Sequence, residues 1–357
     1  MTQAPASKTP VTVLTGYLGA GKTTLLNRIL SEDHGKRYAV IVNEFGEIGI
    51  DNDLIVGADE EVFEMNNGCV CCTVRGDLIR VLSGLMKRKG GFDAIIVETT
   101  GLADPGPVAQ TFFVDEDVKA RTQLDSVTTV VDAKHVLLRL SDSREAREQI
   151  AFADQIVLNK TDLVSEQDLR MVEARLRRLN PLAPIHRAER SNVPLDAILG
   201  RGGFDLERIV SIEPEFLNPA HGEDGHVHDE DCDHGHDHGH HHHGHEHGHD
   251  HAKASDIHDD DIRGISLRLD RPVDGGKITT WLNDLLAAQG PDILRAKGII
   301  DVAGDERRLV FQAVHMILEG DFQRPWNATD QRHSRLVFIG RDLDEAKLRA
   351  GFEACAA

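Results

Sequence analysis

A glycine-rich loop between a strand and a helix constrains this chain most. Residues Gly16 to Thr23 read GYLGAGKT and fit the pattern G-x-x-x-x-G-K-[ST]. The apolar, β-branched segment 11–15 predicts a buried strand before the loop, and apolar residues recur at helical spacing over 24–30 after it. Such a loop turns backbone N–H groups around a phosphate chain at the positive end of a helix. Lys22 can reach β- and γ-phosphates, and the Thr23 hydroxyl can ligate Mg²⁺.

The segments that follow alternate between strand and helix patterns. Buried-strand patterns cover 38–43, 61–65, 92–98, 127–132 and 156–162, and helical patterns cover 78–89, 143–153 and 167–179. Alternation of this kind implies βαβ units and a mostly parallel sheet. We therefore expect an α/β fold, with a P-loop NTPase domain over residues 10–205 behind a disordered lead-in at 1–9.

The composition changes sharply beyond this domain. Fifteen of the twenty histidines lie between His221 and His258, among Asp, Glu and Gly. A segment without apolar periodicity cannot bury a core, so 206–260 is predicted to be a disordered linker. Strand and helix patterns return beyond it, as in 263–270, 277–288, 308–315, 335–340 and 344–354, which predicts a small α+β domain over 261–357.

Length and charge exclude several classes of protein. A chain of 357 residues is long enough for about two domains. The formal net charge of −20 argues against a nucleic-acid partner, because phosphate backbones attract basic surfaces. No apolar run approaches the roughly 20 residues of a membrane span, and the start of the chain lacks the apolar core of a signal peptide. We expect a cytoplasmic protein with no membrane partner.

A second polar cluster follows the predicted strand that ends near 159. Asn159-Lys160-Thr161-Asp162 fits the N-K-x-D pattern that reads guanine in guanine-nucleotide proteins. The Asp carboxylate accepts two N–H donors that adenine does not offer, and a site built for such bonds discriminates strongly. Downstream of a phosphate loop and at a strand exit, this match predicts GTP as the nucleotide, against the alternative of a solvated loop.

The strand over 94–97 ends in Glu98 and then Thr99-Thr100-Gly101. A carboxylate at this position can hold the water shell of Mg²⁺ or orient the attacking water. Gly101 can offer its backbone N–H to a γ-phosphate and act as a hinge. The sequence lacks an obvious water-orienting glutamine, so we expect slow intrinsic turnover.

Three cysteines, Cys69, Cys71 and Cys72, lie within four positions. Thiolates suit Zn²⁺ and its borderline neighbour Co²⁺, whereas a structural zinc site normally uses two separated Cys pairs. One incomplete cluster predicts a site that takes up and releases metal, with a last ligand from Glu44, Glu47 or a mobile histidine. The histidine tract predicts loose binding of Zn²⁺, Ni²⁺, Co²⁺ or Cu²⁺.

Five motifs in this order resemble those of the CobW-type GTPases, relatives of the nickel chaperones UreG and HypB. They are GYLGAGKT, NEFGEIGID, GCVCCTVRGD, ETTGLADP and NKTD. The resemblance covers the whole chain, because family members also carry a histidine-rich linker and a smaller C-terminal domain. It implies a metal-dependent GTPase metallochaperone that hydrolyses GTP to GDP and phosphate.

The resemblance also implies roles for individual residues. It assigns GTP·Mg²⁺ to Gly16, Gly19, Ala20, Gly21, Lys22, Thr23 and Thr24, and guanine recognition to Asn159, Lys160, Thr161 and Asp162. It assigns the second switch and catalysis to Glu98 and Gly101, together with Lys22 and Thr23, and the cargo metal to Cys69, Cys71 and Cys72. Glu44 is kept as a candidate for the last metal ligand. Thr73, Val74, Arg75 and Gly76 are placed to sense nucleotide.

We therefore expect delivery of zinc or cobalt to a client apo-metalloprotein, coupled to GTP hydrolysis, with a homodimer left open. One alternative is a storage protein whose histidine tract holds the metal. Others are a cobalt chaperone of cobalamin synthesis and a GTPase that regulates a partner without transferring cargo.

Overall fold

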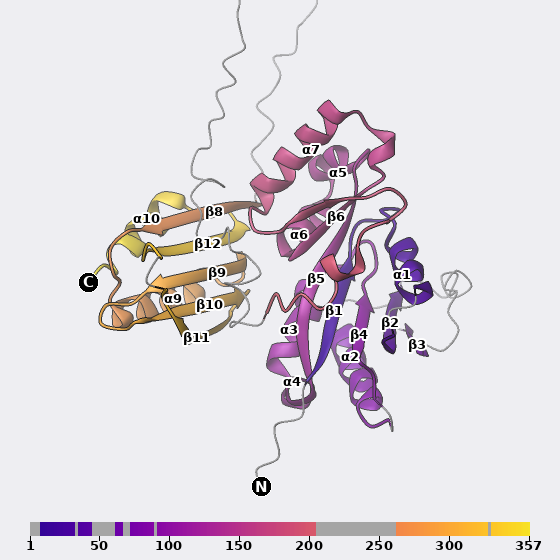
Figure 1. The fold of residues 1–357 in the computed structure, drawn as a ribbon, viewed down its shortest axis with the longest axis horizontal. Coiled ribbons are helices and arrows are strands. Elements are labelled where there is room, and N and C mark those ends of the chain that lie inside the picture. The colour runs from indigo at the N-terminus through magenta and orange to yellow at the C-terminus, as the bar shows by residue number, and fades with distance from the viewer. Residues whose placement is uncertain are drawn as a thin grey trace, which may run out of the picture.

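The computed structural model of the chain describes residues 8–32, 35–44, 61–66, 72–88, 91–204, 262–327 and 330–357, with the backbone alone at 43–44, 61–66 and 72–75. Two sheets organise these residues (Figure 1). None of the helices in these ranges is long and apolar enough to cross a bilayer.

The first sheet is parallel throughout the described pairings. Its strands in spatial order are β3 (Glu61–Asn66), β2 (Tyr38–Glu44), β4 (Ala94–Glu98), β1 (Thr9–Thr15), β5 (Thr122–Asp132), β6 (Gln155–Asn159) and β7 (Ile185–Arg187). Parallel strands end at the same edge of a sheet, so the loops after β1, β4, β5 and β6 gather there. This is the phosphate-loop fold that the sequence predicts.

Helices cover both faces of this sheet. They are α1 (Lys22–Ser31), α2 (Cys72–Leu85), α3 (Gly106–Val114), α4 (Glu116–Arg121), α5 (Val136–Asp142), α6 (Arg144–Phe152) and α7 (Glu166–Leu179), with 3₁₀ turns η2 (Thr161–Leu163) and η3 (Leu195–Ala197). Leu25 and Ile29 of α1 pack on Val40 and Val130 on one face, and α2 to α7 contribute to the core on the other face. In helices such as α1, α2 and α7 the buried side chains recur at helical spacing, so one face of the helix is apolar and packs against the core.

The second sheet is antiparallel and belongs to an α+β domain, as predicted. Its strands in order are β11 (Ile317–Pro325), β10 (Arg307–Val314), β9 (Ile293–Asp301), β12 (Ser334–Arg341) and β8 (Ile262–Leu269), and its helices are α9 (Gly275–Gln289) and α10 (Glu345–Glu353). Successive side chains of a strand point to opposite faces. In β12, Leu336 and Phe338 therefore pack with α9 and α10, whereas Val337 and Ile339 join the core shared with the first domain.

The second sheet lies against α3, α6 and α7 of the first domain (Figure 1). Arg295 of β9 crosses this boundary and is only 3% exposed in its side chain. It donates to Phe152 O at 2.8 Å and to Asp154 Oδ1 at 2.7 Å. Buried charges require partners of this kind, so β9 is anchored to the end of α6.

Candidate nucleotide site

Three glycines give the loop between β1 and α1 its shape. Gly16, Gly19 and Gly21 have φ values of 140°, 74° and 110°, which favour glycine. A Cβ on Gly16 would lie 2.2 Å from Val130 O, and one on Gly21 would lie 2.4 Å from Asn159 Nδ2. Any larger residue at these two positions would push the loop away from β5 and β6.

Lys22 and Thr23 begin helix α1 directly after this loop. The Lys22 side chain is buried, and its Nζ donates to Gly16 O at 2.8 Å, across the base of the loop. Thr23 is half-buried and Thr24 is exposed. The ammonium group is thus held against the backbone of the loop.

The loop that begins with Asn159 is joined to the phosphate loop by direct hydrogen bonds. Asn159 Nδ2 donates to Ala20 O at 2.9 Å. Lys160, in a left-handed conformation with φ 61°, donates from Nζ to Gly19 O at 2.8 Å. Asp162 lies exposed in η2. The structure therefore brings together the two segments that the sequence separates by more than a hundred residues.

Ser191 completes this junction, and the sequence analysis missed it. Its N–H donates to Asn159 Oδ1 at 2.7 Å, and its Oγ donates to Gly21 O at 3.0 Å. Asn159 Nδ2 in turn lies 3.1 Å from Ser191 Oγ, and Arg28 of α1 donates to Ser191 O at 3.0 Å. A strand end is the sequence feature that points to such a residue. The strand before Ser191 has only three residues and no apolar run, so the sequence does not reveal it.

Glu98 lies beside the phosphate loop at the end of β4. It pairs in register with Leu14 of β1 and is buried, 6% exposed. Thr99 donates from N to Leu14 O at 2.9 Å and from Oγ1 to Thr15 Oγ1 at 2.8 Å. Gly101 approaches so closely that a Cβ there would lie 2.7 Å from Leu18 N. The predicted second switch is thus in contact with the phosphate loop.

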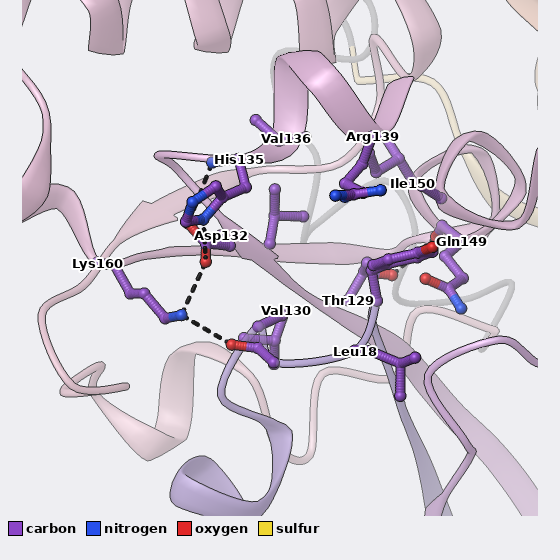
Figure 2. Close-up of a pocket in the computed structure, with 15 residues that line it drawn as sticks. Leu18, Thr129, Val130, Asp132, His135, Val136, Arg139, Gln149, Ile150 and Lys160 are labelled. Atoms are coloured by element: carbon purple, nitrogen blue, oxygen red, sulfur yellow. Dashed lines mark hydrogen bonds and ion pairs between the residues drawn. The ribbon is translucent and has the colours of Figure 1, made fainter. Parts of the chain in front are cut away.

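A pocket of about 540 Å³ adjoins the phosphate loop on the side of α5 and α6. Figure 2 shows Lys160 at one end of this pocket and Gln149 at the other. Asp132 accepts from Lys160 Nζ at 2.7 Å and lies 3.0 Å from His135 Nδ1. Burial favours the neutral acid, but these two partners outweigh it and lower the pKa of Asp132. Asp132 therefore holds Lys160 as a charged pair.

The predicted metal segment lies mainly outside the described residues, as do Cys69, Cys71, Glu47 and the histidine tract. Cys72 is the first residue of α2, so Thr73, Val74, Arg75 and Gly76 form its first turns, whereas the sequence predicts a helix only from residue 78. Val74 is the one aliphatic residue among them, and Gly76 has a low helix propensity, so the local pattern is too weak to predict this turn. Glu44 pairs in register with Asn66 at the strand edge from which the cysteine segment departs. Among described side chains, no group of three metal-ligating residues occurs.

Two family comparisons match the two domains. Residues 10–187 match the family described as CobW/HypB/UreG, nucleotide-binding domain. Residues 262–356 match the family described as cobalamin synthesis protein cobW C-terminal domain.

Full-length relatives show the same similarity. The chain is 36% identical over 347 residues to the zinc chaperone YjiA of Escherichia coli K12, covering 96% of this chain and 97% of the relative. It is 33% identical to the zinc chaperone CobW of a Sinorhizobium species, covering 99% of each chain. The crystal structure of the Zn(II)-bound YjiA GTPase from E. coli superposes with a TM-score of 0.73 at 32% identity, covering 98% of this chain and 100% of that one. The chain therefore belongs to the CobW/HypB/UreG family.

Proposed function

We propose that this chain is a GTP-hydrolysing metallochaperone that carries zinc to a client apo-metalloprotein. The junction of Asn159 and Lys160 with the phosphate loop carries the proposal, because it supports one pre-assembled site for guanine and phosphates. The relatives support GTP hydrolysis and zinc as the cargo, since two are named zinc chaperones and the similar crystal structure is that of a Zn(II)-bound GTPase.

In this proposal the phosphate loop, residues 16–24, cradles the phosphates and Lys22 pairs with the β- and γ-phosphates. Asp162 reads the guanine edge, while Asn159 and Lys160 hold its loop in place. Gly101 donates its N–H to the γ-phosphate. Because the loop is already closed by hydrogen bonds, little ordering is needed when nucleotide binds.

The donors near the phosphate loop suit a magnesium ion. The Thr23 hydroxyl and the Glu98 carboxylate are hard oxygen donors, which Mg²⁺ prefers, and both lie at the same edge of the sheet. Bound Mg²⁺ would neutralise the charge that develops on the phosphates. Thr23 would ligate it directly, and Glu98 would hold its water shell or orient the attacking water.

The cargo is proposed to bind at Cys69, Cys71 and Cys72 with Glu44. Thr73 to Gly76 follow these cysteines on α2 and would sense the nucleotide. Names of the relatives favour zinc over cobalt. Competition between Zn²⁺ and Co²⁺ for the purified chain tests this preference, and light scattering tests whether the chain forms the homodimer that the sequence analysis left open.

Guanine recognition is tested by exchanging Asp162 for Asn. Xanthine carries a carbonyl where guanine carries its amino group, so Asp162→Asn should weaken GTP binding and strengthen XTP binding, each by at least about tenfold. Asp196→Asn, an equivalent change at an exposed aspartate of η3, should alter neither. Unchanged GTP affinity in Asp162→Asn would contradict the guanine assignment.

A metal-storage function is the second candidate, and the fifteen histidines between 221 and 258 favour it. Storage predicts many zinc ions per chain and no effect of Lys22→Ala on zinc delivery. The chaperone proposal predicts the opposite, since Lys22→Ala removes a phosphate contact and should abolish GTP-dependent transfer to an apo-metalloprotein.

A further inference from the structure

A single buried side chain, that of Gln149, holds the second switch loop by hydrogen bonds. Gln149 of α6 is 1% exposed. Its Nε2 donates to Gly101 O and to Ala103 O, both at 3.1 Å. One amide therefore holds two carbonyl groups of the loop that follows β4. Bonds of this kind are costly to lose in a buried site, because the carbonyl groups are left without a donor.

Gly101 is held between this amide and the phosphate loop. A Cβ on Gly101 would lie 2.6 Å from Leu18 Cδ2 and 2.7 Å from Leu18 N. The loop also closes on itself, since Ala103 N donates to Thr100 O at 3.1 Å. The orientation of the peptide after Gly101 is thus set by Gln149, and the position of its Cα by Leu18.

Helix α6 gives Gln149 a rigid support. Thr129 Oγ1 of β5 donates to the backbone oxygen of Gln149 at 2.8 Å. The preceding residue, Glu148, is paired with Arg144 at 2.7 Å and with Arg341 of the second domain. These contacts of Thr129 and Glu148 hold α6 in place. A movement of the switch loop therefore has to be accommodated by the Gln149 side chain or by a shift of α6 against the second domain.

We propose that Gln149 is a positioning residue for GTP hydrolysis, which sets Gly101 at the γ-phosphate. The proposal rests on the proposed GTPase function and assigns to Gln149 no contact with nucleotide. GDP lacks the γ-phosphate, so its binding does not depend on this loop. Loss of the amide should therefore weaken the binding of GTP and leave the binding of GDP unchanged.

The test uses full-length Gln149→Met, which keeps the shape and removes the donor, and Gln149→Glu, which places carboxylate oxygens against the two carbonyl groups. Gln167→Met and Gln167→Glu, at an exposed position of α7, are the matched controls. Affinities for GDP and for a non-hydrolysable GTP analogue, kcat, KM and the thermal midpoint are measured for each.

Both Gln149 variants should lower kcat and analogue affinity by about 10- to 100-fold, while GDP affinity stays near that of the controls. The thermal midpoint should fall in both variants, because two buried carbonyl groups lose their donor. Burial raises the pKa of an introduced carboxyl, and a protonated Glu regains one donor. The kcat deficit of Gln149→Glu should therefore shrink between about pH 8 and about pH 6.

Wild-type kcat and analogue affinity in Gln149→Met would overturn the positioning role. So would equal losses of affinity for GDP and for the analogue, since these indicate a purely structural role. Absence of GTP hydrolysis in the wild-type chain would instead contradict the proposed function, which keeps the two failures distinct.

Discussion

Asn159 shows how one side chain can unite two halves of a binding site. Its amide nitrogen donates to Ala20 O and contacts Ser191 Oγ, while its oxygen accepts from Ser191 N. Asn159 is 2% exposed, so water cannot replace a lost partner. Its main role is thus to hold the phosphate loop and the loop after β6 in one geometry.

Replacing Asn159 by Ala should weaken GDP binding by about 10- to 100-fold, because buried hydrogen bonds contribute about 1 kcal/mol each and several are lost together. Calorimetric titration with GDP measures the effect. Asn192→Ala, at an exposed position next to Ser191, is the control and should bind GDP as the wild type does. Equal affinities in the two variants would contradict the joining role.

Sequence reasoning predicts some of these residues and misses others for a physical reason. Lys22 and Asn159 belong to motifs in which the spacing of residue types encodes the chemistry. Ser191 and Gln149 act through hydrogen bonds to residues far away in the sequence, such as Asn159, 32 positions from Ser191, and Gly101, 48 positions from Gln149. No local pattern reports such long-range pairs.

At the scale of the element, β9 links the two domains through buried charge. Asp154 follows α6 and is paired with Arg295 at 2.7 Å and Lys297 at 3.4 Å. Burial favours the neutral form of Asp154, but the two cations and their hydrogen bonds outweigh it and lower the pKa of Asp154. Arg295 also stacks on Phe204, 4.6 Å from the ring centre.

Asp154→Asn should destabilise the protein at pH 7 by about 3–5 kcal/mol, because two buried cations lose their counter-ion. A carboxyl with a lowered pKa in the folded state stabilises the protein above its unfolded pKa, and this stabilisation is lost as the pH falls through the folded pKa. The difference from the wild type should therefore be full above the ordinary Asp value of 3.8 and shrink below it.

Urea unfolding across the pH range measures this difference. Asp154→Leu combined with Arg295→Met and Lys297→Met replaces the ions by apolar groups and should recover much of the stability at pH 7. A difference between Asp154→Asn and the wild type that stays constant below pH 3.8 would contradict the assignment of the lowered pKa to Asp154.

The charged residues of β9 also explain why the sequence analysis predicts some strands and not this one. The strands β1, β4 and β6 are short apolar runs, and their pattern alone identifies them. The sequence analysis did not identify β9, because Arg295, Lys297 and Asp301 interrupt its apolar residues, although all nine positions are buried. Their partners come from other segments, and a local pattern does not show this.

At the scale of the whole molecule, one hydrophobic core spans both domains. It joins residues such as Phe152, Leu176 and Ile150 of the first domain with Leu294 and Val337 of the second. Because the two domains share this core, we expect them to unfold together. The sequence predicts two domains but not this interface. The apolar run of β12 is typical of a strand buried on both faces, but a local pattern does not tell which segment covers each face.

Both tryptophans, Trp281 and Trp326, lie in the second domain. Their fluorescence therefore reports the unfolding of that domain, while nucleotide is proposed to bind the first. Saturating GDP should raise the fluorescence-detected thermal midpoint, because ligand binding to the folded state stabilises every part of a cooperative unit. The expected gain is about 2.7 kcal/mol at a hundredfold excess over Kd.

Arg295→Ala removes the buried link between the domains and should reduce this rise, whereas Arg349→Ala, on the outer helix α10, should not. A midpoint that does not respond to GDP in the wild type would show that the domains unfold independently.

In the proposed function, the binding of GTP and the binding of metal are coupled. Zinc affinity of the full chain, measured by competition with a chelator, should be about 5- to 150-fold tighter with a non-hydrolysable GTP analogue than with GDP, and zinc should tighten analogue binding by the same factor. Replacing Cys69, Cys71 and Cys72 by Ser should abolish the difference and leave the weaker sites of the histidine tract. Equal zinc affinities with the analogue and with GDP would contradict the coupling.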